Sequence, residues 1–431
     1  MADESYRGGS AQSVPYATRR RRPSRRAVVL TILALAGLGG IAALLALRNW
    51  SGPTSRFDGY VYVESNRVRR NSVLAYRFAD GRFRLLAEYP TGGRGAVDFG
   101  QSGALDADGQ LAYHPPRRLL FAVNQGSDSV AVFHVGRDGT LTAAPGSPFP
   151  SGGKAPAGIG VAGDFAVVAD KAQDASRDLN LVRPAYAVFR VGVDGRLAPV
   201  MRFLVDAGAS PTQALVVGRV VAGTEEAGPF RSFTLDADGR LRQAPGSPLE
   251  PESSVFPSGY DGARWAIGLV PHPHRALLYA DQAATAKLLI YSYDPKGRLD
   301  FVRAVRNVGA KLPCWTAVTP DGRRLYTANA GNGTVSAFDL SHDPMKPRHL
   351  QTLPLEHAGN PWGLALAPDG RTLFVVDPRA VAQVHRGRGN RLHALAIRSS
   401  GRLKELSHSP IRLPAGDDAS PLGIAVVPRA G

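Results

Sequence analysis

One arginine, two amide side chains and three tryptophans stand at one position of an internal repeat, and these residue types could do chemistry there. Arg264 could hold a carboxylate or a phosphate, or stabilise an oxyanion, because its guanidinium carries several donors in a fixed plane. The neighbouring Trp265 belongs to a set of three equivalent tryptophans that could stack on a sugar ring, with their indole N–H groups as donors. We therefore predict Arg264 as a catalytic residue and five residues as substrate-binding, namely Gln213, Trp265, Trp315, Asn360 and Trp362.

Each candidate also has a structural interpretation. The indoles could fill seams between packed sheets, and Arg264 could be a charge on a rim. Asp261 and the pair Glu225-Glu226 could act as general bases, but their spacing identifies no second partner, and solvated loop carboxylates are the alternative. Cys314 has no neighbouring His in the sequence, which favours buried packing. The sequence contains no phosphate loop, paired-Cys zinc pattern or nucleophile elbow, and we predict no metal and no cofactor.

A repeat of similar units must position these side chains. Its marker is a two-residue turn, Asp-Gly in most units, followed by an apolar residue. The turn glycines are 58, 56, 44, 58 and 104 residues apart, at Gly81, Gly139, Gly195, Gly239, Gly297 and Gly401. The last interval is twice 52, and Asp343-Pro344 stands inside it in place of the Asp-Gly turn, which makes seven units.

Each unit contains short alternating or β-branched runs that predict four strands. In the sixth unit, for example, residues 315–319, 325–328 and 335–338 form three such runs before the turn, and a fourth follows it. Seven four-stranded units predict an all-β, seven-bladed β-propeller. The first unit starts at its second strand, at Tyr60, and the chain finishes with an isolated first strand at 422–427. We therefore expect the last strand to complete the first blade.

In a propeller the first strand of each blade lines the central channel, and the loops that enter these strands form one mouth. All six predicted site residues stand just before such a strand or at its start, so we expect them at this mouth. A small-molecule substrate or a protein partner would bind there. Two long polar loops, 171–184 and 378–391, connect second and third strands and should lie on the same face.

Several segments resemble the lactonase-like seven-bladed propellers, which include 6-phosphogluconolactonases and carboxymuconate cyclases. The resemblance covers residues 58–431 and rests on 91–95, 101–105, 122–130, the Pro-Gly-Ser-Pro segments at 145–148 and 245–248, and 314–322. It implies a lactonase-like hydrolase or isomerase that acts on a lactone or a sugar acid without a redox cofactor. The Arg-His pair that well-studied members carry at the start of an inner strand has no equivalent in the matching places of this chain.

Three function classes stay open at this point. A lactone hydrolase or related isomerase is implied by the resemblance, since a shared fold permits analogy. A non-enzymatic, membrane-tethered binding or scaffolding propeller is favoured by the lack of an assignable acid–base set. A cofactor-bearing dehydrogenase propeller is the third class, but its metal ligands and cofactor contacts are not recognisable in the sequence.

The N-terminal region predicts a membrane anchor. Residues 27–47 are 21 uncharged, mostly apolar residues, long enough to cross a bilayer as a helix. Six arginines at positions 19–22, 25 and 26 precede them, and the positive-inside rule places the tail 1–26 in the cytoplasm. We predict a single-pass protein of the bacterial inner membrane, with 48–57 as a linker and the propeller, 58–431, on the periplasmic or extracytoplasmic side. A signal peptide cleaved after 34–36, or twin-arginine export through 24–29, is the alternative.

The composition agrees with this organisation. Gly and Pro account for 48 and 33 of the 431 residues, which disfavours long helices and favours a turn-rich β protein. The single Cys excludes an internal disulfide. Of the net charge of +16, the eight arginines and two acids of residues 1–48 account for +6, and the remaining +10 is scattered without aromatic interleaving. We therefore expect no nucleic-acid partner, and we expect a monomer.

Overall fold

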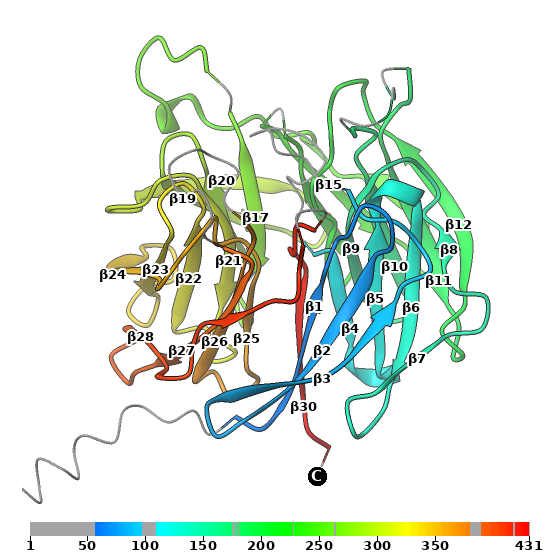
Figure 1. Ribbon diagram of the computed structural model, residues 1–431. Helices are drawn as coiled ribbons and strands as arrows, with labels where there is room; N and C mark the ends of the chain where they lie inside the picture. Colours follow the sequence, from blue (N-terminus) through cyan, green and yellow to red (C-terminus); the bar gives the residue numbers. More distant parts are fainter. Residues whose placement is uncertain are drawn as a thin grey trace, which may run out of the picture. The chain divides into compact units, whose positions relative to one another are not determined.

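The described part of the chain forms a ring of β-sheets around a central axis (Figure 1). The computed structural model describes residues 57–96, 109–174, 177, 179, 181–226, 228–262, 264–379, 389–416 and 419–430. Within these residues the strands form seven sheets, five of them with four strands and two with a short fifth strand. The predicted all-β, seven-bladed propeller is confirmed.

Each blade runs from an inner first strand to an outer fourth strand, and neighbouring strands are antiparallel. The strands are, in blade one, β30 (Ile424–Pro428), β1 (Gly59–Glu64), β2 (Ser72–Ala79) and β3 (Arg82–Pro90); in blade two, β4 (Leu111–His114), β5 (Leu119–Asn124), β6 (Ser129–Val135) and β7 (Leu141–Ala143), with β8 (Phe149–Pro150) beside β6; in blade three, β9 (Pro156–Ala162), β10 (Phe165–Asp170), β11 (Ala185–Val191) and β12 (Leu197–Leu204); in blade four, β13 (Leu215–Val217), β14 (Val220–Thr224), β15 (Phe230–Leu235) and β16 (Leu241–Gln243); in blade five, β17 (Ala266–Pro271), β18 (Leu277–Gln282), β19 (Lys287–Tyr293) and β20 (Leu299–Arg306); in blade six, β21 (Pro313–Val318), β22 (Arg324–Asn329), β23 (Thr334–Asp339) and β24 (Arg348–Pro354); and in blade seven, β25 (Leu364–Leu366), β26 (Thr372–Asp377), β27 (Arg391–Ile397) and β28 (Leu403–Glu405), with β29 (Ile411–Arg412) beside β27.

The ring closes through the two ends of the propeller. β30 pairs antiparallel with β1, so that Val426 lies opposite Val61 and Ile424 lies opposite Val63. The backbone edge of β1, which would otherwise be open to pairing with another chain, is therefore covered. The prediction that the last strand completes the first blade is confirmed.

Apolar side chains from facing sheets fill the seams between neighbouring blades. Three buried tyrosines of second strands add a polar contact across their seams, because each hydroxyl donates to a carbonyl in the hairpin turn of the next blade. The pairs are Tyr62 with Gly139 (2.9 Å), Tyr279 with Pro344 (2.9 Å) and Tyr326 with Gly401 (3.1 Å). Burial of the rings and satisfaction of their hydroxyls both favour the ring arrangement.

The hairpin turns differ in length from the prediction. Asp80 and Gly81 form the predicted two-residue turn, with φ values of 52° and 73°. In blade two, however, the loop spans 136–140, closed by a hydrogen bond from the Gly136 N–H to the Thr140 carbonyl (2.8 Å). Six of the seven turns share a glycine with positive φ, and at Gly139, where φ is 84°, a Cβ would overlap the ring of Tyr60.

A buried polar residue ends the second strand of each blade. These residues are at most 1% exposed and form a layer just below one end of the ring: Glu64, Asn124, Asp170, Thr224, Gln282, Asn329 and Asp377. Burial raises the pKa of Glu64 to about 8 and that of Asp170 well above its usual value. Glu64 is therefore expected to be mostly protonated at neutral pH, and in both carboxyls burial favours the neutral form.

The N-terminal predictions concern residues outside the described ranges. The tail 1–26, the predicted span 27–47 and nearly all of the linker 48–57 stay predictions. Among the residues that the structure describes, no helix has the length and apolar character needed to cross a membrane.

Candidate functional site

The channel mouth is the end of the propeller at which the inner strands begin and the second strands end. All six predicted site residues lie at this end, with Gln213 ahead of β13, Arg264 and Trp265 ahead of β17, Trp315 in β21, and Asn360 and Trp362 ahead of β25. The long loop after β10 also starts here, because it connects a second strand to a third strand. The fold thus positions the candidates on one face, although it does not bring all of them into contact.

The three tryptophans form one apolar cluster at blades five to seven. Trp315 is only 2% exposed, and its ring packs against that of Trp362 with the centroids 3.9 Å apart. Trp265 and Trp362 are half-buried and pack against the same group, which also contains Cys314. Cys314 is buried, as its structural interpretation predicted. Among the described residues, the buried Nε1 of Trp362 has no hydrogen-bond acceptor.

The two predicted amide residues connect neighbouring blades. Gln213 is buried; its Nε2 donates to the Leu269 carbonyl (2.7 Å), and its Oε1 accepts from the Leu269 N–H (2.8 Å). Asn360 is half-buried, and its Nδ2 donates to the Ala330 carbonyl (3.0 Å). The amide of Gln213 therefore holds β17 in place at the mouth, next to Arg264 and Trp265.

Arg264 lies at the rim of the mouth between blades four and five. Its guanidinium carbon is 5.1 Å from the ring centroid of Phe256, a distance suited to a cation–π contact. Within the described residues no carboxylate or hydrogen-bond partner is assigned to this side chain. Its Cβ packs against Gly228, which places Arg264 beside the turn that carries Glu225 and Glu226.

Two buried ion pairs occupy this turn and its surroundings. The Lys171 Nζ lies 2.9 Å from the Glu226 Oε2; the Lys171 side chain is fully buried and that of Glu226 is 11% exposed. Glu225 forms a two-pronged contact with Arg231, in which Arg231 Nε pairs with Oε1 and Nη2 lies 3.3 Å from Oε2. Glu225 and Glu226 are therefore not solvated loop carboxylates, which was one interpretation of their sequence.

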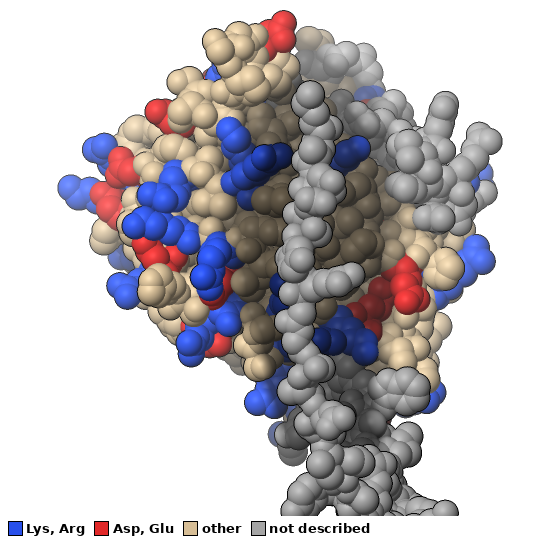
Figure 2. All heavy atoms as spheres, turned by 90° about the vertical axis from the view of Figure 1, so that its left-hand side faces the viewer, with Lys and Arg blue, Asp and Glu red and all other residues tan. Residues whose placement is uncertain are grey.

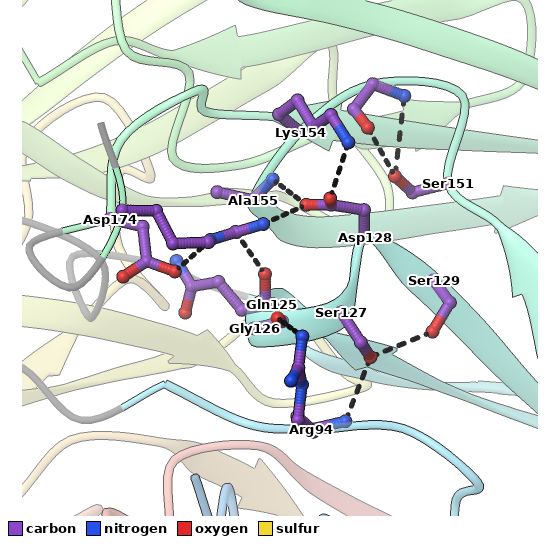
Figure 3. A network of polar contacts seen from close by, with 12 residues as sticks. Arg94, Gln125, Gly126, Ser127, Asp128, Ser129, Ser151, Lys154, Ala155 and Asp174 are labelled. Atoms are coloured by element: carbon purple, nitrogen blue, oxygen red, sulfur yellow. Dashed lines mark hydrogen bonds and ion pairs between the residues drawn. The ribbon is translucent and has the colours of Figure 1, made fainter. Parts of the chain in front are cut away.

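Polar contacts join the loops of blades one to three across the mouth (Figure 3). Arg177, in the loop after β10, pairs with Asp174 (2.6 Å) and reaches Asp128 of blade two (2.8 Å). Lys154 also contacts Asp128 (2.9 Å). Although burial raises the pKa of Asp128, these cations and the Ala155 N–H lower it overall, so the carboxylate stays charged. These contacts hold the described part of the loop against blade two.

The mouth thus combines an aromatic half and a charged half. Blades five to seven supply indole faces and one unsatisfied N–H, whereas blades one to four supply ion pairs. Arg264 stands between the halves. A ligand with an apolar ring face and a carbonyl or anionic oxygen would match this distribution, because the rings favour the flat face and the cations favour the electron-rich oxygen.

A buried histidine lies between two carboxylates near this end of blade seven. His393 Nδ1 is 2.6 Å from Glu405 Oε1, and its Nε2 is 3.5 Å from Asp377 Oδ2. Although burial lowers the pKa of His393, the two carboxylates raise it to about 9. The same cation lowers the pKa of Glu405, even though burial raises it. The cluster therefore contains a buried imidazolium at neutral pH.

This cluster predicts a loss of stability in mildly alkaline solution. The pKa of His393 is about 9 in the folded chain against 6.5 in the unfolded one, so its contribution is complete below pH 6.5 and disappears as pH rises towards 9. We expect the free energy of unfolding to fall by up to about 3 kcal/mol over that interval. Urea titrations at pH 6.5, 7.5 and 9 on the wild type and on His393→Gln would measure the decrease. An equal decrease in both proteins would contradict the assignment.

Comparisons with known proteins support the fold. No protein-family model and no curated protein matches the sequence. A solved structure from Bacteroides uniformis, proposed to be a 6-phosphogluconolactonase, is 16% identical, with a TM-score of 0.63 over 86% of this chain and 100% of that one. The periplasmic gluconolactonase of Pseudomonas aeruginosa is 17% identical, with a TM-score of 0.62 over 86% of this chain and 100% of its own.

A solved structure that is not described as a lactonase is also similar in fold. A protein from Sulfolobus tokodaii described as a hypothetical selenium-binding protein is 11% identical, with a TM-score of 0.57 over 87% of this chain and 94% of that one. At such identities the similarity is one of fold. The resemblance to lactonase-like propellers is therefore confirmed as a shared seven-bladed architecture.

Proposed function

We propose that the chain is a lactonase-like hydrolase that opens a lactone of a sugar acid at the channel mouth. The observation that carries this proposal is the Lys171–Glu226 ion pair on the turn that packs against Arg264. The pair supplies a carboxylate and a cation, while Arg264 lies beside the same turn and next in sequence to Trp265, whose indole belongs to the aromatic cluster. The shared architecture with a gluconolactonase agrees with this activity.

In the proposed reaction, Glu226 accepts a proton from water as the water oxygen attacks the lactone carbonyl. Arg264 stabilises the oxyanion that forms on the carbonyl oxygen. The ring C–O bond then breaks, and the proton passes to the leaving alkoxide, giving the open hydroxy acid. Lys171 holds the Glu226 carboxylate in position through their ion pair, in which Nζ lies 2.9 Å from Oε2.

Hydrolysis of sugar lactones by residues 53–431, followed by pH-stat titration, tests this assignment. We expect Glu226→Gln to lower kcat/KM by about 10²–10⁴-fold, because it removes the base. We expect Arg264→Ala to lower it by about 10²–10³-fold, because it removes an oxyanion donor. Asp238→Asn and Arg240→Ala make the same chemical changes on exposed side chains of the opposite face and should leave the rate unchanged.

The possible results of these assays test the two assigned residues and the proposed reaction separately. Activity that persists in Glu226→Gln, with the fold confirmed by circular dichroism, would reject Glu226 as the base. Activity unaffected by Arg264→Ala would reject that residue. If the wild type opens no lactone in the screen, the hydrolase proposal fails as a whole.

A binding propeller is the second candidate, and the position of Arg264 favours it. The guanidinium lies over Phe256, and no carboxylate is assigned to it within the described residues. A site that only holds an anion or a sugar needs no acid–base pair. Binding of sugar acids by calorimetry, without turnover and weakened by Trp362→Leu, would support this alternative.

We also propose the cellular arrangement that the N-terminal sequence predicts. A single span at 27–47 would tether a monomeric propeller on the periplasmic or extracytoplasmic side of the inner membrane. The run of 21 uncharged residues after six arginines supports it. Alkaline extraction of membranes, with protease access to the propeller from outside, would test both the tether and its orientation.

A further inference from the structure

A basic groove lies on the face of the propeller opposite the mouth, between blades six and seven. It has a volume of about 720 Å³ and is lined by the turn after β21, the turn after β25 and the start of the turn after β27. Four arginines and two aspartates line it, namely Arg323, Arg324, Arg371, Arg398, Asp321 and Asp369. Figure 2 views the propeller from the side of blades five to seven and shows that Lys and Arg predominate over Asp and Glu there.

The two aspartates are engaged by their own turns. Asp321 Oδ1 accepts the Arg323 N–H (3.0 Å) and the Thr319 hydroxyl (2.6 Å). Asp369 Oδ1 accepts the Arg371 N–H (2.9 Å). These backbone contacts define the two equivalent Pro-Asp-Gly-Arg turns and place Arg323 and Arg371 at matching positions on the two sides of the groove.

Two of the four guanidinium groups have a nearby carboxylate in the groove, because Asp321 interacts electrostatically with Arg323 and Arg324. Arg324 pairs with Asp339 (2.6 Å). Arg323, Arg371 and Arg398 are exposed, and within the described residues no ion pair or hydrogen bond is assigned to their side chains. Four guanidinium groups against two carboxylates leave the lining with a net charge of +2, and like charges along one groove repel one another unless a further anion lies between them. The groove therefore has the chemistry of an anion site.

The turn between the third and fourth strands contains an aspartate in blades one to six and none in blade seven. Between the third and fourth strands, blades one to six carry an aspartate each, at Asp80, Asp138, Asp194, Asp238, Asp294 and Asp343. Blade seven has Ser399-Ser400-Gly401 between Arg398 and Arg402 instead. In blades one to six each aspartate is accompanied by at least one basic residue, as in Asp194-Gly195-Arg196, so the turn of blade seven, with Arg398 and Arg402 and no acid, is the most positive of the seven.

The propeller chain also begins on this face. Gly59, the first residue of β1, pairs with Pro428 at the end of β30, on the side away from the mouth. The predicted membrane span ends at residue 47, so at most about eleven residues, or roughly 40 Å of extended chain, separate the two. Blade seven is the neighbour of blade one, and its turns therefore lie within reach of the same membrane surface.

From these observations we propose that the basic groove docks on the phosphate groups of anionic phospholipid headgroups. Arginine pairs with phosphate through two parallel donors, and a membrane presents a surface of such groups. Docking on this face would leave the mouth turned away from the membrane and open to its ligand. The inference does not depend on the chemistry proposed for the mouth.

Vesicle co-sedimentation of residues 53–431 tests the docking, since the ring closes within these residues and the predicted span is absent. We expect binding to phosphatidylglycerol-containing vesicles and none to pure phosphatidylcholine, with a loss of binding as salt screens the charges. The triple variant Arg323→Gln, Arg371→Gln and Arg398→Gln should weaken binding by about tenfold or more.

A matched triple variant controls for net charge. Arg84→Gln, Arg242→Gln and Arg303→Gln remove the same charge from exposed positions on the outer strands β3, β16 and β20. Equal weakening by both triples would overturn the groove as the docking site. Equal binding to neutral vesicles would overturn the phosphate chemistry. Binding of soluble glycerol phosphate at micromolar concentration, with no preference for vesicles, would assign the groove to a free phosphate ester instead.

Discussion

Deletion of residues 421–431 from the propeller, residues 53–431, is expected to abolish its cooperative folding. The deleted segment contains β30, the only strand that pairs with the open edge of β1 in the described structure. It also removes the buried side chains of Leu422 and Val427, which are 2% and 0% exposed. Burial of two such residues contributes about 3–6 kcal/mol, which is comparable to the whole stability of many domains. Loss of the sigmoidal urea transition would measure the effect.

A rearranged chain provides the control for this deletion. Pro428 lies opposite Gly59, and the Arg429 N–H donates to the Asp58 carbonyl (3.3 Å), so the end of β30 and the start of β1 are adjacent. Residues 421–430 placed ahead of Phe57 through a short Gly-Ser linker should therefore rebuild blade one. Recovery of the transition would show that pairing, and not the position of the segment in the chain, closes the ring. A deletion variant as stable as the parent would refute closure through β30.

The ring could be predicted from the sequence because its evidence is local and repeated. Runs such as 335–338 alternate between the two faces of a sheet, and the turn glycines fix where each hairpin reverses. The first unit lacks its first strand, and the chain ends with an isolated first strand. Pairing of these two ends was therefore the arrangement that completed both. The length of the turns was less predictable, since Asp80-Gly81 and 136–140 differ in backbone path although both contain Asp-Gly.

The aromatic half of the mouth was also accessible to sequence analysis, but its packing was not. Repeat position alone placed Trp265, Trp315 and Trp362 at one end of consecutive blades. Which indole is buried depends on side-chain packing between blades, and Trp315 is covered by Trp362. The amide of Gln213 likewise satisfies a backbone 56 residues away, which spacing within one blade does not indicate.

The charged half of the mouth was missed because several of its contacts, such as Lys171–Glu226 and Asp128–Arg177, join different blades. Lys171 and Glu226 are 55 residues apart, about one repeat, and each follows the polar end of a second strand. Opposite charges at similar positions in consecutive repeats are the signal that could have identified this pair. A second recurring feature of the sequence is the polar residue at the end of each second strand, such as Asn124 or Asn329.

Arg231→Met is expected to be the most destabilising single substitution near the mouth. It leaves Glu225, whose side chain is 1% exposed, without its cation. Burial already raises the pKa of Glu225, and Arg231 opposes this effect in the wild type. Breaking one side of a buried pair costs about 3–5 kcal/mol, because the remaining charge is not solvated. Urea unfolding at pH 7 would show the loss, and part of it should be recovered as the pH is lowered, because burial favours the protonated form of Glu225 in the variant.

Two further variants decide whether the cost comes from the unpaired charge. The double substitution Glu225→Gln and Arg231→Met removes both charges, so it should recover most of the stability that the single variant loses. Arg298→Met breaks a pair with Asp300 in which both side chains are more than half exposed, and it should change stability by less than about 1 kcal/mol. Additive losses in the double variant would mean that packing around Arg231, and not its charge, holds the turn that carries Glu226.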